Sequence, residues 1–249
     1  MVLTLVAACV GCGHVEPMHA RAPGDPEVRA LDVGGGTNAY LVMGARPILV
    51  DTGWGASTDA IEHELARNGV QPHDLALIVL THGHGDHAGG ARRLHELSGA
   101  KVLAGAGDVT MLAAGKNRPL TPMGFLGRRL LSYSDKPFPA LVPDLTLAGD
   151  FDLAPFGIAG TIVSTPGHTP GSLVVLLPHG DAIVGDLMRG TIGRPHAPAR
   201  HFFHDDCAAA EAHLAPLIAR GVKRLYVGHG GPLDAQDALA WLRENPCPK

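Results

Sequence analysis

The 249-residue sequence has no dense block of lysine or arginine, and its net charge is −4. Proteins that bind nucleic acid through its phosphates concentrate positive charge, so we expect no nucleic-acid partner. Beyond the first dozen residues there is no apolar run of the length that a transmembrane helix requires. Low-complexity runs are missing as well, and 45% of the residues are hydrophobic. This composition is typical of a folded protein with a sizeable core.

Cysteine is also scarce, with four in the chain. Cys9 and Cys12 lie near the N-terminus, and Cys207 and Cys247 lie far apart in sequence. A disulfide between the latter two would indicate an oxidising compartment, but the sequence leaves open whether they meet.

Residues 1–27 are predicted to form a short lipoprotein or signal segment and a tether, and residues 28–249 a single folded domain. Met1 to Val10 is apolar apart from Thr4, and residues 6–9 resemble the box before the lipidated cysteine of a bacterial lipoprotein. We therefore predict membrane attachment through a lipidated Cys9 and a location in the cell envelope or periplasm. The alternative is a cytoplasmic protein, because the apolar stretch is short and no basic residue precedes it.

The domain alternates short apolar runs with amphipathic segments. Strands are predicted at residues 41–42, 48–50, 75–80, 102–103, 161–163, 173–177, 182–184 and 225–227. Helices are predicted at residues 59–68, 88–97, 206–219 and 235–243. Residues 115–149 are rich in proline and glycine, and they form either a wall of a substrate pocket or an irregular covering loop.

The apolar run 75–80 is followed directly by a segment with three imidazoles and a carboxylate, namely His82, His84, Asp86 and His87. In an extended backbone alternate side chains point the same way, so His82 and His84 can face one metal ion. The intervening glycines allow a sharp bend that turns Asp86 and His87 toward a second position. Four buried side chains of this kind would each need a polar partner, so packing does not explain them. The segment predicts a metal site.

Three later residues share a placement at the end of an apolar strand: His168, Asp186 and His229. Each is preceded by glycine, which permits a close approach of the backbone. Each alone could be an ordinary loop residue. Because strand ends on one sheet edge converge in space, we expect all three to join the same site.

In this order the residues resemble the pattern of the metallo-beta-lactamase superfamily, from about residue 28 onward. The resemblance implies an α/β fold, a four-layer αββα sandwich of two mixed β-sheets flanked by helices. It implies one metal ion on His82, His84 and His168, a second on Asp86, His87 and His229, and Asp186 bridging them. Asp51 is similar to the family's early strand-end aspartate, which orients a ligand from behind.

Imidazole and carboxylate ligands favour zinc, and we predict two Zn²⁺ ions per chain, with iron or manganese as alternatives. The predicted function is hydrolysis of an ester, thioester, lactone or related bond in a small molecule through a metal-bridging hydroxide. Asp86 is the predicted catalytic residue, which orients the hydroxide and carries its proton. The alternatives are a mononuclear iron enzyme resembling persulfide dioxygenases and a non-catalytic metal-binding envelope protein.

Three further features bear on the substrate. Asp186 stands where two β-lactamase subclasses place cysteine, which favours the thioesterase, lactonase and phosphodiesterase branches. Only a short segment follows His229, whereas hydroxyacylglutathione hydrolases carry a further helical region, so a glutathione thioester is disfavoured. Arg189 is predicted either to pair with a substrate anion or to be a solvated loop residue. The sequence leaves the substrate and the oligomeric state open.

A second polar cluster lies in a proline-containing loop. It is predicted to be a solvated loop whose last residues cap a helix, with a separate metal site as the alternative. Its members are His196, His201, His204, Asp205 and Asp206.

Overall fold

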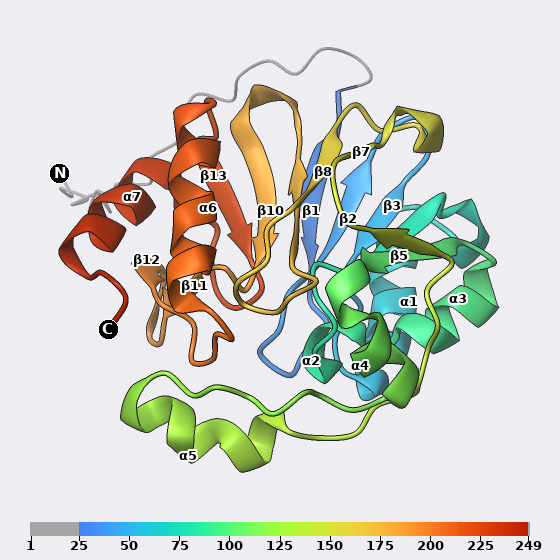
Figure 1. Ribbon diagram of the computed structural model, residues 1–249. Coiled ribbons are helices and arrows are strands. Elements are labelled where there is room, and N and C mark those ends of the chain that lie inside the picture. Colours follow the sequence, from blue (N-terminus) through green and yellow to red (C-terminus); the bar gives the residue numbers. More distant parts are fainter. Residues whose placement is uncertain (1–24, 249) are drawn as a thin grey trace, which may run out of the picture.

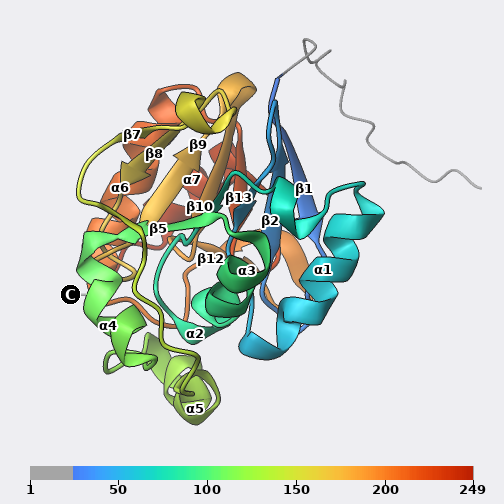
Figure 2. The same cartoon turned by 90° about the vertical axis from the view of Figure 1, so that its right-hand side faces the viewer.

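The computed structural model describes residues 25–248, so the predicted lipidation site at Cys9 lies outside the described residues. Two six-stranded sheets face each other, and helices cover their outer faces (Figures 1 and 2). The predicted four-layer αββα sandwich of mixed sheets is confirmed. None of the helices within residues 25–248 is long and apolar enough to cross a membrane.

The first sheet contains the N-terminal strands in chain order. They are β1 (Glu27–Leu31), β2 (Ala39–Met43), β3 (Ile48–Val50), β4 (Leu77–Val79), β5 (Lys101–Gly105) and β6 (Leu145–Leu147). The pairings from β1 to β3 are antiparallel and those from β3 to β6 are parallel. Its outer face is covered by α1 (Thr58–Arg67), α3 (Ala91–Ser98) and α4 (Val109–Ala114).

The second sheet has the order β14-β13-β10-β9-β8-β7. Its strands are β7 (Phe151–Asp152), β8 (Thr161–Ser164), β9 (Leu173–Leu176), β10 (Asp181–Gly185), β13 (Arg224–Val227) and β14 (Leu233–Asp234). Only the β10–β13 pairing is parallel. Its outer face is covered by α6 (Cys207–Ala219) and α7 (Ala235–Glu244).

Alternation along each strand divides the apolar residues among three cores. In β4, Leu77 packs between the two sheets, whereas Ile78 points outward and packs with Ile61 and Leu65 of α1. In the same way Ile183 of β10 faces the central core, while its neighbours in the strand face α6 and α7. Both faces of each sheet are therefore buried, which explains why the strands read as continuous apolar runs.

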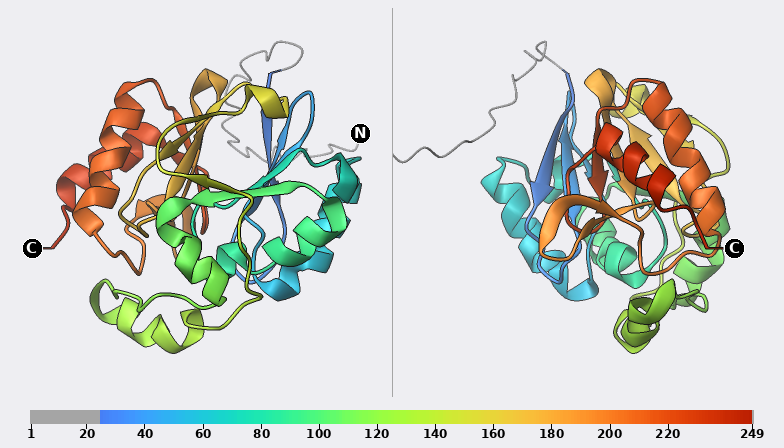
Figure 3. Two further views of the ribbon diagram at one scale, coloured as in Figure 1. Left: turned by 45° about the vertical axis from the view of Figure 1, so that its right-hand side comes forward. Right: turned by 90° about the vertical axis from the view of Figure 1, so that its left-hand side faces the viewer.

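The carboxyl ends of β3, β4 and β5 lie at one edge of the sandwich together with those of β8, β10 and β13. Two backbone hydrogen bonds join the sheets there: Leu173 N–H to Thr81 O at 2.7 Å and Asn38 N–H to Gly228 O at 2.7 Å. Beyond this edge lie a hairpin of β11 (Arg189–Thr191) and β12 (Arg194–Ala199), and the helix α5 (Gly124–Ser134) (Figures 1 and 3).

The structure differs from the predicted elements in several places. The predicted helix 88–97 is divided into α2 (Gly85–Ala88) and α3. Gly89 and Gly90 lie between them and pack so closely against backbone that a side chain at either position would clash. The segment 115–149 is not wholly irregular, since it contains α5 and β6. The short strands β1, β7, β11, β12 and β14 are not predicted from the sequence.

Candidate metal centre

All seven residues that the sequence predicts as ligands lie at the common edge of the two sheets. The histidine-rich segment follows β4, and the other three residues follow β8, β10 and β13. They are His82, His84, Asp86, His87, His168, Asp186 and His229, and all or most of each side chain is buried.

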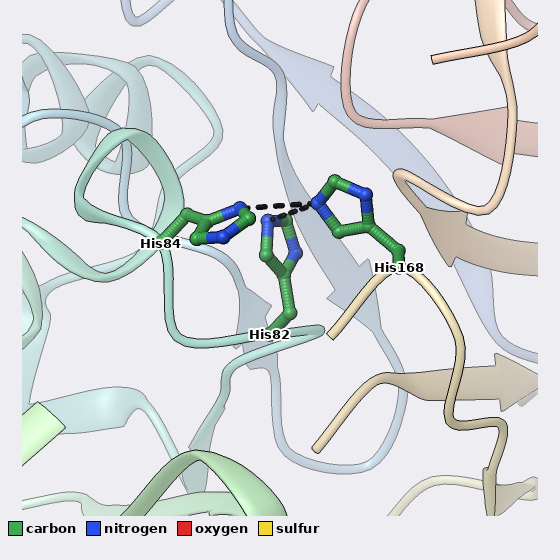
Figure 4. A group of neighbouring side chains, drawn as sticks. All are labelled: His82, His84 and His168. Carbon is green, nitrogen blue, oxygen red and sulfur yellow. Dashed lines mark hydrogen bonds between the residues drawn. The ribbon is translucent and has the colours of Figure 1, made fainter. Parts of the chain in front are cut away.

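The first group consists of His82, His84 and His168, whose rings turn toward one another (Figure 4). His168 Nε2 lies 3.2 Å from His82 Nε2 and 3.1 Å from His84 Nδ1. Three imidazole nitrogens from two sheets therefore meet at one point, and each ring offers one ligand atom there.

The second group consists of Asp86, His87 and His229. Asp86 Oδ2 lies 3.4 Å from His229 Nε2 and 3.9 Å from His87 Nε2. Asp186 lies between the groups: its Oδ2 is 3.8 Å from His82 Nε2 and 3.4 Å from His87 Nε2. The same oxygen is 3.6 Å from the imidazole of His168 in the first group and 3.4 Å from that of His229 in the second.

Hydrogen bonds behind the first group determine which ring nitrogen carries the proton. His168 Nδ1 donates to the carbonyl of Phe203 at 2.9 Å. Thr81 Oγ1 donates to Asp51 Oδ2 at 2.7 Å, so it accepts from His82 Nδ1 at 3.1 Å. In the neutral state both Nε2 atoms then present bare lone pairs to each other.

The second group has the same arrangement. His87 Nδ1 donates to Asp51 Oδ2 at 2.9 Å, and His229 Nδ1 donates to the carbonyl of Gly36 at 2.7 Å. Their Nε2 atoms point toward Asp86 and Asp186. Ligand histidines typically have their outer nitrogen held in this way.

The convergence of these donor atoms suits metal ions. Lone pairs that converge on one another and on carboxylates repel unless a cation lies between them. His87 Nε2 and Asp186 Oδ1 are buried and have no hydrogen-bond partner among the described residues. The residues present therefore fit a pair of metal ions, with imidazole and carboxylate as the donors.

The charges of the site follow from burial and from the two carboxylates. Burial lowers the pKa of His82, His84 and His168, which favours the neutral, ligating form. Burial also opposes charge on His229, but Asp186 and Asp86 outweigh it and raise its pKa to about 10. In the absence of a cation, protons bound to histidines such as His229 balance the negative charge of the carboxylates. A bound metal ion would replace these protons.

Asp51 lies directly behind the histidine-rich segment, where the sequence places an orienting aspartate. Its carboxylate accepts from Thr81 N–H at 2.7 Å as well as from the Thr81 hydroxyl and His87. Its backbone has φ of +62°, a left-handed conformation that aspartate tolerates better than most residues. The carboxylate of Asp51 therefore connects Thr81 with His87.

Asp108 is a buried residue of the site that the sequence analysis does not identify. It accepts from Gly83 N–H at 2.7 Å, from the Thr169 hydroxyl at 2.7 Å and from Gly171 N–H at 3.0 Å. It therefore joins the loop of His82 and His84 to the loop of His168. The sequence offers no signal for this role, because a single aspartate after a strand is common.

The second polar cluster is only partly the solvated loop that the sequence predicts. Asp206 caps α6 by accepting from Ala209 N–H at 2.9 Å, as expected, and His196 is exposed. His201 and His204 are instead 5% and 2% exposed. Both rings lie edge-on to His168, with centroids 4.8 Å and 5.3 Å away, so they extend the candidate metal centre.

A cavity of about 350 Å³ opens onto Asp86, Asp186 and His229. The segment 115–149 contributes Leu130 and Tyr133 of α5 to its wall. Other parts of its lining include Trp54, Arg189, Ile192 and Phe202.

Arg189 faces this cavity. Its guanidinium lies 3.9 Å from the ring centroid of Phe202, and Nη1 donates to the carbonyl of Gly190 at 2.7 Å. Its Nε is buried and has no hydrogen-bond partner within residues 25–248.

Cys207 and Cys247 form a disulfide that joins α6 to the C-terminal segment. Close to it, Arg200 donates to Glu211 Oε1 from Nε at 2.9 Å and from Nη2 at 2.7 Å. The backbone N–H of Cys247 donates to Glu211 Oε2 at 3.1 Å. The ion pair between Arg200 and Glu211 holds the start of the loop that carries His201.

Comparisons with known proteins agree with this geometry. Residues 32–229 match the family model described as the metallo-beta-lactamase superfamily. A probable metallo-hydrolase from Methanocaldococcus jannaschii is 28% identical over 78% of this chain and 87% of its own length. A hydroxyacylglutathione hydrolase from Anaeromyxobacter dehalogenans is 32% identical over 76% of this chain, which spans 59% of that enzyme. A metallo-beta-lactamase structure from Cronobacter sakazakii superposes with a TM-score of 0.59 at 26% identity, covering 90% of this chain and 85% of that one.

Proposed function

Because the chain belongs to the metallo-beta-lactamase superfamily, a superfamily of metal-dependent hydrolases, we propose that it is a binuclear zinc hydrolase of a small-molecule ester, thioester or lactone. The observation that carries the proposal is the position of Asp186. Its Oδ2 lies within 3.8 Å of imidazoles from both ligand groups. A carboxylate between two groups of ligands is suited to a pair of metal ions.

His82, His84 and His168 would hold one zinc ion and Asp86, His87 and His229 the other, with Asp186 shared. Nitrogen and oxygen donors of this kind are those that zinc prefers. When bound, a zinc pair supplies a nucleophile at neutral pH and stabilises the negative charge that develops on the attacked group.

Asp86 is the proposed catalytic residue. Its side chain is 19% exposed and lines the cavity, whereas the side chain of Asp186, which also reaches the cavity, is 1% exposed. Burial alone would raise the pKa of Asp86, but His87 and His229 hold it well below its usual range. The ionised carboxylate can accept a proton from the attacking water and pass it to the leaving group.

The cavity supports a small substrate with an apolar part and an anionic group. Leu130, Tyr133 and Ile192 offer apolar contact, and we propose that Arg189 binds the anion. A buried guanidinium nitrogen without a partner is costly, and a substrate carboxylate would satisfy it. Burial lowers the pKa of Arg189, yet an arginine remains charged at neutral pH.

Thioesters are the first class to assay. The relative from Anaeromyxobacter dehalogenans is a hydroxyacylglutathione hydrolase, but this chain spans 59% of its length. We therefore propose an acyl thioester as the substrate class, and we do not propose that the thiol portion is glutathione.

The test is a panel of esters, thioesters, lactones, lactams and phosphodiesters, assayed with zinc-loaded protein and with Asp86→Asn. We expect turnover of at least one acyl substrate and a loss of about 10²–10⁴-fold in Asp86→Asn, with most of the metal retained. Unchanged turnover in a fully loaded variant would remove Asp86 from the mechanism. Bound metal with no turnover on any substrate would support the non-catalytic alternative, and oxygen consumption with one iron per chain would support the dioxygenase alternative.

We also propose that the protein is exported. Disulfides persist in oxidising compartments, and the Cys207–Cys247 pair is of this kind. Fractionation of cells that express the full chain, compared with Cys9→Ser, tests the proposal. If wild type were found in the cytoplasm in the same amount as Cys9→Ser, the proposal would be contradicted.

A further inference from the structure

His201 lies inside the candidate metal centre although the seven-residue pattern does not include it. Its Nε2 is 3.2 Å from Asp186 Oδ2, closer than any of the other four imidazoles that face this oxygen. Its ring stacks on that of His229, with centroids 5.3 Å apart and planes 21° apart. It also lines the cavity, so it is on the side from which a substrate would approach.

We propose that His201 is an additional metal ligand, which holds a metal ion together with His168 and Asp186. The three ligand atoms lie within 4.8 Å of one another, as they do in each of the two groups described above. The proposal rests on the metal binding proposed above and adds an eighth side chain to the ligand set.

The surroundings of the ring favour coordination. Nδ1 lies 3.2 Å from the carbonyl of Phe203, which can accept its proton and leave Nε2 bare. A bare Nε2 that faces a carboxylate is repelled unless a cation lies between them.

The loop that carries His201 is fixed at both ends, as an element that positions a ligand should be. Before it, Arg200 is bonded to Glu211 and to the carbonyl of Asn245. After it, Asp205 N–H donates to the carbonyl of His168 at 3.2 Å. The loop of His201 is thus connected to the backbone of His168, the histidine with which His201 would share a metal ion.

One other arrangement is compatible with the same atoms. Phe203 N–H lies 3.3 Å from His201 Nδ1. If it donates there, the proton is on Nε2 and His201 is a hydrogen-bond donor to Asp186. A glutamine could replace such a donor but is a poor zinc ligand, so His201→Gln distinguishes the two roles.

The experiment compares wild type, His201→Gln and His201→Ala after loading with Co²⁺ or Zn²⁺. Competition with a chromophoric chelator measures the affinity, and proton NMR of the cobalt form counts the histidines whose ring signals are shifted by the metal. We expect six shifted histidines in wild type and five in both variants. We also expect zinc affinity about tenfold or more weaker for one of the bound ions.

His196→Ala is the matched control, because His196 lies on β12 but is exposed, and its Nδ1 forms a hydrogen bond with the carbonyl of Pro232. It should bind metal as wild type does. Five shifted histidines in wild type, or wild-type affinity in His201→Gln, would overturn the proposal. The wild-type count decides the question even if both variants fail to fold.

A negative result for His201 can be distinguished from failure of the proposed function. Wild type that binds two zinc ions and turns over a substrate, with five shifted histidines, would reject only the role of His201. Wild type that binds no metal would reject both.

Discussion

At the scale of single residues, the site depends on a few carboxylates that hold the ligand rings from behind. Asp51 receives the outer proton of His87 directly and that of His82 through Thr81. One side chain therefore fixes the ring orientation of a histidine in each ligand group. A substitution that weakens the hydrogen bonds of Asp51 should therefore weaken metal binding in both ligand groups.

Asp51→Asn should weaken zinc binding about 10–100-fold, because an amide offers one acceptor oxygen and turns a donor toward its other partners. Asparagine tolerates the backbone φ of +62°, so the fold should persist. Chelator competition measures the affinity, with the exposed Asp32→Asn as the control. Equal affinity in the two variants would mean that Asp51 does not orient the ligands.

His204 supplies a prediction about pH. Burial lowers its pKa from 6.5 to about 3, and neither ring nitrogen has a hydrogen-bond partner among the described residues. As pH falls below 6.5 the unfolded chain binds a proton at His204 that the folded chain does not, so the free energy of unfolding decreases. The loss at pH 5 is about 2 kcal/mol.

His204→Leu should remove this dependence. In protein freed of metal, the decrease in unfolding free energy between pH 7.5 and pH 5 should be about 2 kcal/mol smaller than in wild type. Urea denaturation at the two pH values measures it, and the exposed His63→Ala is the control. The same decrease in His204→Leu and wild type would show that His204 is not the group responsible.

The sequence predicts the candidate ligands better than the residues that support them. His82, His84, Asp86 and His87 are recognisable because ligand-type side chains are concentrated in six positions. Asp108 acts on Gly83 and Thr169 from a distant part of the chain, and nothing local to it indicates that contact. His201 is hidden for the same reason, since its neighbours in sequence are typical of a solvated loop.

At the scale of elements, α5 is the part that the sequence describes least well. Its glycine and proline neighbours suggest an irregular loop, yet residues 124–134 form a helix that lies beyond the edge of the two sheets (Figure 1). Leu130 and Tyr133 face the cavity, whereas Phe125 on the same helix is 72% exposed and does not line it. The helix is therefore positioned to contact a molecule that binds in the cavity.

Tyr133→Ala should raise KM about five- to tenfold and leave kcat and metal content unchanged, because it removes an apolar contact that is made equally in the ground and transition states. The Tyr133 ring packs edge-on against Trp54, with centroids 6.2 Å apart. Steady-state kinetics on the active substrate, with Phe125→Ala as the matched control, measures the effect. A lower kcat with KM unchanged would place Tyr133 in the chemical step instead.

At the scale of the whole molecule, the disulfide links the second half of the sandwich to its last residues. It closes a segment of 40 residues, which corresponds to a stabilisation of about 4 kcal/mol from restriction of the unfolded chain. The double variant Cys207→Ser/Cys247→Ser should therefore unfold at lower denaturant concentration. Equal midpoints for the variant and the oxidised wild type would show that the pair contributes nothing to stability.

The overall fold could be predicted because the order of the candidate ligands resembles that of a known family. The periodicity of the apolar residues does not specify this fold. Apolar runs such as Leu77–Val79 and Asp181–Gly185 are buried on both faces, so they show no alternation that assigns a residue to a layer. The backbone hydrogen bond from Leu173, at the start of β9, to Thr81, just after β4, joins the two sheets and depends on contacts between distant parts of the chain.

The central claim is that the ligands hold two zinc ions around Asp186. The most direct test is the metal content of wild type, measured by elemental analysis after zinc loading and removal of free metal. The account predicts close to two zinc ions per chain. One ion per chain, or iron in preference to zinc, would contradict it.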